Sequence, residues 1–375
     1  MKSSMFLKVF IVLFAFSIFI SCRPKNKETS VVRSPEFKQS IDEVYERLRL
    51  FRETNFVPGM SVAVSVDNKL VFADGFGYSN LEFKVPAMPD HRYRIGTVSE
   101  IITTLTAAKL YELNKLGIDK PTSELLNENG TDSLKYTIRQ LAGHAAGIEE
   151  ETDPAGTKDP DEIGKMVSTF INHKLMYEPG TFSFHTELDF DMIGYLIQKT
   201  QNQPFDKVVK EILSDSLKLQ STMPDNPFRV TDKKTSHYEM SYLSQPIMAE
   251  QIDLRGKEAS AGYISSVTDL VKIGNLFLFP GFLKQETIDM MTRPFQLKNG
   301  GKSRYGFGLI VVNDSDGRLL YGAHGNVLGG CAALLIDPTD KIVVAMAANM
   351  SGKGIELPVS DVSRAFIRQL HSGKN

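Results

Sequence analysis

Histidine and cysteine are the side chains most able to act as bases, nucleophiles or metal ligands near neutral pH. The 375-residue chain has seven histidines and two cysteines. Four of the histidines stand far apart in the sequence: His91, His173, His237 and His371. They lack the short Cys/His or His/carboxylate spacings of common metal sites. The sequence therefore predicts no metal site, and no cofactor.

The cysteine at position 22 closes a distinctive N-terminal segment. Two lysines precede an apolar run over residues 9–20, which ends at Ser21 and Cys22. A run of this length is typical of a signal peptide and is short for a membrane span. A small residue immediately before a cysteine resembles the lipobox of bacterial lipoproteins. We expect a signal peptide over 1–21, lipidation at Cys22 and a flexible tether over 22–34, with simple secretion or an uncleaved anchor as alternatives.

This prediction places the protein outside the cytoplasm, anchored to a membrane and facing the periplasm or the cell surface. Cys331 would then be the single cysteine of the mature chain, so no intrachain disulfide is expected. Its apolar neighbours favour a buried thiol. The formal net charge of -2, with both signs scattered along the chain, argues against nucleic acid as a partner.

The elements that must position any site follow from hydrophobic periodicity. Apolar residues at three- and four-residue intervals predict a helix over 35–53, and a Val-rich alternating pattern around Asp67-Asn68 predicts a β-hairpin over 60–76. Strand patterns are then largely absent from about 100 to 255. Further helices are predicted at 101–116, 137–141, 161–174, 189–200, 205–213, 267–279 and about 359–370. Further strands are predicted at 305–312, 318–321, 332–336 and 341–347.

These elements predict an α/β protein of the α+β type, with an antiparallel sheet flanked by helices. A single domain over 35–372 would contain an α/β lobe, from about 35–100 and 256–372, and an inserted helical lobe over about 101–255. The groove between the two lobes is the expected ligand site.

Several short segments, in the same order along the chain, resemble class C β-lactamases and related penicillin-binding esterases. They are residues 57–64, 75–78, 93–96, 137–139, 143–147, 178–181, 261–266 and 305–308. The likeness extends from about 36 to 370, and around 280–287 it is greatest to the mitochondrial serine β-lactamase-like branch. It implies a β-lactamase/transpeptidase-like fold and three catalytic elements.

The first element that the resemblance implies is Ser-x-x-Lys at a helix N-terminus, where the lysine accepts the proton of the serine. Thr97 and Glu100 stand at these positions. The extra methyl group of Thr97 crowds attack. Glu100 reverses the charge, and a carboxylate is a poor base for an alcohol at neutral pH. Ser99 lacks a lysine three residues on, so we expect its hydroxyl to bond within the helix.

The second implied element is Tyr-x-Asn, which relays protons and orients the substrate. It is read here as Phe184-His185-Thr186. Phe184 keeps a ring but cannot exchange a proton, whereas Thr186 also occurs at this position in the mitochondrial-like branch. We expect His185, the middle residue, to pack or to point to solvent. His144 lies in a loop that is usually structural in the family.

The third implied element is Lys-Thr-Gly or His-x-Gly on the strand that edges the cleft. It is read as His324-Gly325-Asn326. His324 is retained, whereas Asn326 adds a side chain where glycine allows close approach of a substrate. Thr186, Gly325 and Asn326 are accordingly predicted to contact any bound ligand.

The leading hypothesis is a β-lactamase-related exported lipoprotein that has lost the acylation machinery and binds a peptide, a cell-wall fragment or a protein partner in the cleft. The alternative is an active esterase, peptidase or β-lactamase that uses Thr97 as nucleophile, with His185 or His324 as base. A third hypothesis, a structural or self-assembling protein, follows from analogy with the mitochondrial-like branch. The oligomeric state is not predicted.

Overall fold

The computed structural model describes residues 30–127, 134–149, 174–352 and 355–372. Residues from Val31 onward form one compact unit. The predicted signal peptide, Cys22 and all but the last residue of the helix predicted over 161–174 lie outside the described residues.

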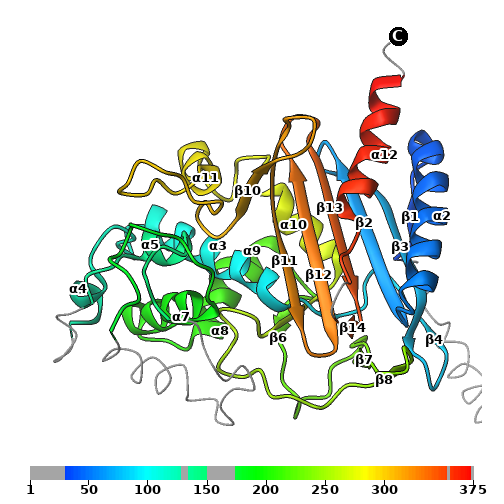
Figure 1. Cartoon of the computed structure of the whole chain (residues 1–375), viewed down its shortest axis with the longest axis horizontal. Coiled ribbons are helices and arrows are strands. Elements are labelled where there is room, and N and C mark those ends of the chain that lie inside the picture. Colours follow the sequence, from blue (N-terminus) through cyan, green and yellow to red (C-terminus); the bar gives the residue numbers. More distant parts are fainter. Residues whose placement is uncertain (1–29, 128–133, 150–173, 353–354, 373–375) are drawn as a thin grey trace, which may run out of the picture. The chain divides into compact units, whose positions relative to one another are not determined.

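An antiparallel sheet is the centre of the unit (Figure 1). Its strands run in the order β1-β3-β2-β13-β12-β11-β10, and β4 pairs with β3. Their bounds are β1 Val32–Arg33, β2 Gly59–Val66, β3 Lys69–Asn80, β4 Val85–Pro86, β10 Ile310–Asn313, β11 Leu319–Val327, β12 Gly330–Asp337 and β13 Ile342–Ala348. Strands β2 and β13 pair through Ala63 and Ala345, so the two ends of the chain share one sheet as predicted.

The hairpin of β2 and β3 turns as its sequence predicts. Asp67 and Asn68 both have positive φ, 47° and 62°. Two left-handed residues in succession match the right-handed twist of the flanking strands, and Asp and Asn tolerate this conformation better than other residues with a Cβ.

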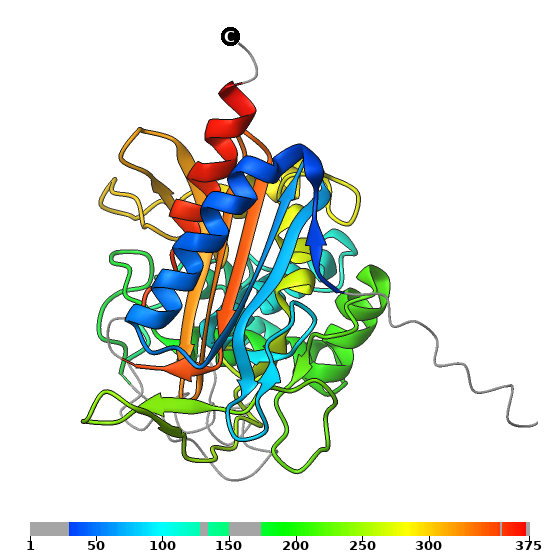
Figure 2. The same cartoon turned by 90° about the vertical axis from the view of Figure 1, so that its right-hand side faces the viewer.

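Helices cover both faces of the sheet, so β2, β12 and β13 are buried along their whole length. In Figure 2, α2 (Lys38–Thr54, blue) and α12 (Val359–Ser372, red) lie across one face. Phe366 of α12 packs against Phe37 and Phe72, with ring centroids 5.6 and 6.4 Å away. On the other face, α10 (Val267–Asn275) contacts β13.

The helical lobe adjoins this second face. Its elements are α3 Ser99–Glu112, α4 Thr122–Leu126, α5 Ile138–Ala142, α7 Glu187–Gln201, α8 Phe205–Val209, the π-helical turn η3 Lys210–Ser214, and α9 Asp215–Leu217. Helix α3 is buried at nearly every position, because other helices surround it. The 3-10 turn η2 (Gly96–Val98) leads from the sheet region into α3.

Smaller elements join the two lobes. Two three-stranded sheets have the orders β5-β9-β6 and β14-β7-β8. Their strands are β5 Tyr93–Arg94, β6 Met223–Pro224, β7 Tyr238–Met240, β8 Pro246–Met248, β9 Tyr263–Ser265 and β14 Met350–Ser351, and the remaining helical elements are η1 Pro35–Phe37 and α11 Gln285–Thr292.

A buried ion pair fixes the strand that precedes η2. Arg94 Nε lies 2.7 Å from Asp225 Oδ2, and the two side chains are 2% and 1% exposed. Arg94 Nη1 also donates to the carbonyl of Leu328 at 2.7 Å, and Lys234 pairs with the other oxygen of Asp225. These contacts tie β5 to the segments on either side of it.

Several predictions about the elements were wrong. The tether was predicted to extend through Ser34, but Val32–Arg33 forms edge strand β1, which β-branched Val32 favours and an ion pair between Arg33 and Asp74 stabilises. Strands β6, β7 and β8 lie in the region where strand patterns are largely absent from the sequence. They have two or three residues each, so they depend on their pairing partners and have no periodic pattern of their own.

Other predicted elements were too long. The helix predicted over 101–116 ends at Glu112, and Asn114 adopts a left-handed conformation with φ 57°. The helix predicted over 267–279 ends at Asn275, and the strand predicted over 305–312 begins only at Ile310. In the described part of the chain, no helix combines the length and hydropathy needed to cross a membrane.

Candidate functional site

Close backbone packing positions Thr97. Turn η2 crosses strand β11 where two glycines meet, and Gly96 has φ 52°. A Cβ on Gly325 would lie 2.6 Å from the Thr97 nitrogen and 2.8 Å from the Val98 nitrogen. Glycine at 325 is therefore required for this approach, which sets the Thr97 side chain beside the strand that carries His324.

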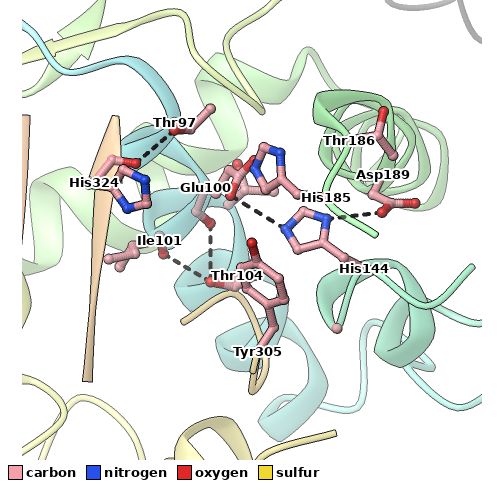
Figure 3. Close-up of polar contacts among 12 residues, drawn as sticks. Thr97, Glu100, Ile101, Thr104, His144, His185, Thr186, Asp189, Tyr305 and His324 are labelled. Carbon is pink, nitrogen blue, oxygen red and sulfur yellow. Dashed lines mark hydrogen bonds and ion pairs between the residues drawn. The ribbon is translucent and has the colours of Figure 1, made fainter. Parts of the chain in front are cut away.

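The Thr97 hydroxyl is held by the backbone. Its Oγ1 donates to the carbonyl oxygen of His324 at 2.9 Å (Figure 3). No imidazole nitrogen or carboxylate within the described residues is a hydrogen-bond partner of this hydroxyl. The single O–H of Thr97 is thus directed at a carbonyl and not at a base.

A pocket of about 280 Å³ opens beside Thr97. Four of the residues predicted to belong to the site line it, namely Thr97, Glu100, His324 and Asn326. The other lining residues are His185, Glu187, Tyr305, Gly308, Ile310 and Ala323. The sequence elements around 97 and 324 therefore lie beside one pocket, and Tyr305 joins them there.

Glu100 lies one helical turn after Thr97 and is nearly buried, with 8% of its side chain exposed. Its Oε1 is 3.4 Å from His185 Nε2, and its Oε2 is 3.8 Å from His144 Nε2. Burial raises the pKa of the Glu100 carboxyl, but the two imidazoles outweigh burial and bring that pKa below its usual range. The carboxylate is therefore ionised and engaged at neutral pH.

His144 is buried between two acids. Its Nδ1 is 3.0 Å from Asp189 Oδ2 in helix α7, and both side chains are 1% exposed. Burial lowers the pKa of His144, but Asp189 and Glu100 outweigh it and raise that pKa to about 9. Burial raises the pKa of Asp189 to about 6 despite the attraction of His144. The pair is therefore an imidazolium bound to a carboxylate at neutral pH in the absence of other cations.

Aromatic packing orients the imidazoles. The ring of His144 lies with its centroid 4.4 Å from that of His185 and 4.5 Å from that of Tyr305 (Figure 3). His144 itself has a strained positive φ of 51° in the loop after α5. The loop thus directs a buried imidazole toward the pocket wall, whereas the sequence predicted only a structural histidine there.

The structure places Phe184, His185 and Thr186, read in the sequence as one element, in three different environments. Phe184 is 40% exposed, lies outside the pocket and donates its N–H to the His144 carbonyl. Thr186 is buried and caps helix α7, where its Oγ1 accepts from Leu188 N at 3.3 Å. His185, expected to pack or face solvent, packs its ring against His144 and is 39% exposed, and it also lines the pocket. No local pattern distinguishes these three orientations.

The remaining predicted residues have structural positions. Ser99 Oγ donates to the Gly96 carbonyl at 2.7 Å, in the turn that leads into its helix, and it also accepts from Tyr263 N in strand β9. Gly325 has no side chain, and this allows the backbone of Thr97 to approach strand β11 closely. Cys331 is buried, as expected, and is the free cysteine of the described residues.

The sequence predicted no cluster of metal-ligating side chains, but the fold assembles one. One donor atom from each of Glu100, His144 and His185 lies within 4.8 Å of the others. These residues are 44 and 41 positions apart along the chain, so no sequence spacing could reveal them. The acid replaces the lysine expected from the family pattern, and both histidines face it.

Comparisons with known proteins agree with this architecture. Human mitochondrial serine β-lactamase-like protein LACTB is 21% identical over 439 aligned residues, which cover 88% of this chain and 80% of that protein. Protein flp of Staphylococcus aureus strain MW2 is 24% identical, with 88% and 66% covered.

Solved structures show the same fold. The octameric penicillin-binding protein homologue from Pyrococcus abyssi has a TM-score of 0.75 and 23% identity, over 89% of this chain and 78% of that one. FmtA from Staphylococcus aureus has a TM-score of 0.74 and 19% identity, over 92% and 94%. The predicted β-lactamase/transpeptidase-like fold is confirmed. The model of the family described as Beta-lactamase matches residues 48–359, and the chain therefore belongs to the β-lactamase family.

Proposed function

We propose that this protein is a binding member of the β-lactamase family that does not form an acyl-enzyme. The observation that carries the proposal is the state of the Thr97 hydroxyl, which donates to the His324 carbonyl and has no adjacent base in the described structure. An alcohol must lose its proton as it attacks an acyl group, and this geometry offers that proton no acceptor of suitable pKa.

Glu100 does not supply the missing base. A carboxylate is already a weak base for an alcohol, and the two imidazoles lower the pKa of Glu100 further. Its charge would also oppose the oxyanion of a tetrahedral intermediate. Loss of the nucleophile or base from a coupled catalytic unit typically costs about 10⁴- to 10⁶-fold in rate.

The alternative, in which Thr97 attacks with His185 or His324 as base, has less support. His185 Nε2 lies 3.4 Å from Glu100 Oε1, so this nitrogen is directed at the acid. His324 offers its backbone carbonyl to Thr97, and its side chain is not the partner. The alternative would require both side chains to rearrange when substrate binds.

The charge around the pocket favours a ligand that carries amines or amides. Glu100 and Glu187 both line it, and His324 and Asn326 add groups that form hydrogen bonds. A free carboxylate on the ligand would be repelled by the two acids. A peptide, a cell-wall fragment or a segment of a partner protein, presented to a lipid-anchored protein outside the cytoplasm, fits these requirements. The anchor at Cys22 is part of the proposal and rests on the sequence pattern alone.

Covalent labelling tests the proposal. Purified full-length protein is incubated with a fluorophosphonate probe and with a fluorescent penicillin, and intact mass is measured beside an active penicillin-binding protein. We expect no adduct on this protein, and the same spectrum from Thr97→Ala. An adduct that maps to Thr97 or Ser99 and disappears on substitution of that residue would refute the proposal.

A further inference from the structure

The cluster of Glu100, His144 and His185 contains polar atoms that the protein itself leaves unsatisfied. Glu100 Oε1 and His144 Nε2 are buried, and neither has a hydrogen-bond partner. Buried polar atoms without partners are uncommon in folded proteins because each costs about 1–3 kcal/mol. Both atoms belong to a cluster in which one donor atom from each of Glu100, His144 and His185 lies within 4.8 Å of the others, and this arrangement points to a ligand outside the chain that satisfies them.

The separations are longer than those of ordinary hydrogen bonds and suit ligands of one ion. His144 Nε2 and Glu100 Oε2 are 3.8 Å apart, and His185 Nε2 and Glu100 Oε1 are 3.4 Å apart. Two donors at about 2.0–2.1 Å from a tetrahedral zinc ion lie roughly 3.3 Å from each other. The two distances to Glu100 exceed this value by about 0.5 and 0.1 Å, and all three donor atoms lie within 4.8 Å of one another, so binding of an ion would draw the side chains together.

We propose that Glu100, His144 and His185 form a binding site for a divalent transition-metal ion, with Zn²⁺ as the reference ion. Two imidazoles and one carboxylate are donors that suit zinc, iron, cobalt, nickel or copper, whereas magnesium and calcium prefer oxygen ligands throughout. The site goes beyond the proposed binding function, and it is independent of whether Thr97 can be acylated.

Asp189 completes the site as a positioning residue. It receives Nδ1 of His144 at 3.0 Å, which fixes the ring and leaves Nε2 directed at Glu100 (Figure 3). Metal-binding histidines usually donate their second nitrogen to such a carboxylate or carbonyl. The charges of Glu100 and Asp189 together balance the two positive charges of the ion.

The fourth ligand would come from the pocket. Glu100 and His185 line the 280 Å³ pocket beside Thr97, whereas His144 lies behind them. Three protein ligands with an open position are typical of zinc sites that bind a water or an exogenous ligand. An oxygen or nitrogen donor on a ligand bound in this pocket could therefore coordinate the ion directly.

Cobalt titration tests the site. Full-length protein is prepared without a polyhistidine tag, treated with chelator and dialysed, and is then titrated with Co²⁺ while visible absorption is recorded. Zn²⁺ competition gives the zinc affinity. We expect one equivalent of Co²⁺ with the d–d bands of a four- or five-coordinate site, and displacement by one equivalent of Zn²⁺.

Variants assign the ligands. His185→Ala should weaken Co²⁺ binding by at least about 100-fold, and Asp189→Asn by about 10- to 100-fold. His324→Gln is the matched control, because His324 lines the same pocket but lies outside the cluster, and it should bind Co²⁺ like the unmodified protein. His185 is 39% exposed, so its replacement leaves the core intact, and thermal melting verifies folding.

Three results would overturn the proposal. The first is that folded, chelator-treated protein binds no Co²⁺ or Zn²⁺ at micromolar concentration, which would mean that His144 and the two acids only share protons and hydrogen bonds. Metal could bind with the same affinity to His185→Ala. His324→Gln could lose as much affinity as His185→Ala, which would place the ion elsewhere in the pocket.

Discussion

Replacing Gly325 by Ala should separate Thr97 from strand β11 and lower stability. The new Cβ would lie 2.6 Å from the Thr97 nitrogen and 2.8 Å from the Val98 nitrogen, and nearest of all to the carbonyl oxygen of Ile95. All three are backbone atoms, so no flexible side chain can move aside. The turn that carries Thr97 must shift as a whole.

The size of the effect follows from these distances. Non-bonded heavy atoms are comfortable at about 3.5 Å, so η2 has to retreat by about 1 Å from the strand. Overpacking of this kind costs about 1–3 kcal/mol. The hydrogen bond from Thr97 Oγ1 to the His324 carbonyl, now 2.9 Å, would be broken at a further cost of about 1 kcal/mol. We expect the free energy of unfolding to fall by about 2–4 kcal/mol.

Urea denaturation followed by circular dichroism measures this change, and differential scanning calorimetry supplies Tm. Gly352→Ala is the matched control, because its Cβ would meet only side-chain atoms at 3.6 and 3.7 Å and its φ is not positive. That control should change stability by less than about 1 kcal/mol, in either direction. The effect at 325 would then be due to the contact with η2 and not to the loss of a glycine as such.

The reasoning about Gly325 would be refuted by a Gly325→Ala protein as stable as the control. It would also be refuted by a crystal structure of that variant in which the Thr97 hydroxyl still donates to the His324 carbonyl at an unchanged distance. Either result would mean that the crossing of η2 over β11 tolerates a side chain, so that glycine there does not position the site.

Three further predictions concern groups outside the pocket. Asp225→Asn should cost about 3–5 kcal/mol, because Arg94 would be left buried without its counter-charge, and a loss below 1 kcal/mol by urea denaturation would argue against that role. Burial, followed by the charge of Arg94, lowers the pKa of His237 from 6.5 to about 3. Between these pH values the unfolded chain binds a proton at this residue and the folded protein does not, so the free energy of unfolding falls as the pH drops from 6.5 toward 3. Between pH 7.5 and 5, the free energy of unfolding of His237→Gln, measured by urea denaturation, should therefore fall by about 2 kcal/mol less than that of the unmodified protein. Equal decreases in the two proteins would contradict this. Burial raises the pKa of Cys331 to about 12, so iodoacetamide at pH 7.5 should modify it only in urea, and rapid alkylation of folded protein, read by mass, would refute its inaccessibility.

Local sequence patterns were sufficient for the elements that frame the site. The apolar stripe over 35–53 and the Val-rich segments around Asp67-Asn68 express their own periodicities, and both elements form where predicted. Thr97 and Glu100 are three residues apart, so any helix through them presents both to one side. These features depend on residues that are close together in the sequence, so they can be predicted from one sequence without knowledge of the fold.

Tertiary packing alone decided what surrounds Glu100. The sequence indicated that an acid replaces the expected lysine, and from this the loss of a base could be inferred. It could not indicate that His144 and His185 would meet that acid, because the loop after α5 and the start of α7 approach α3 only through long-range packing. Likewise Phe184, His185 and Thr186 are consecutive, and the position of the helix cap determines which of them enters the pocket. Side-chain direction just outside a helix depends on that cap and on the surfaces packed against it, and these exist only in the folded chain.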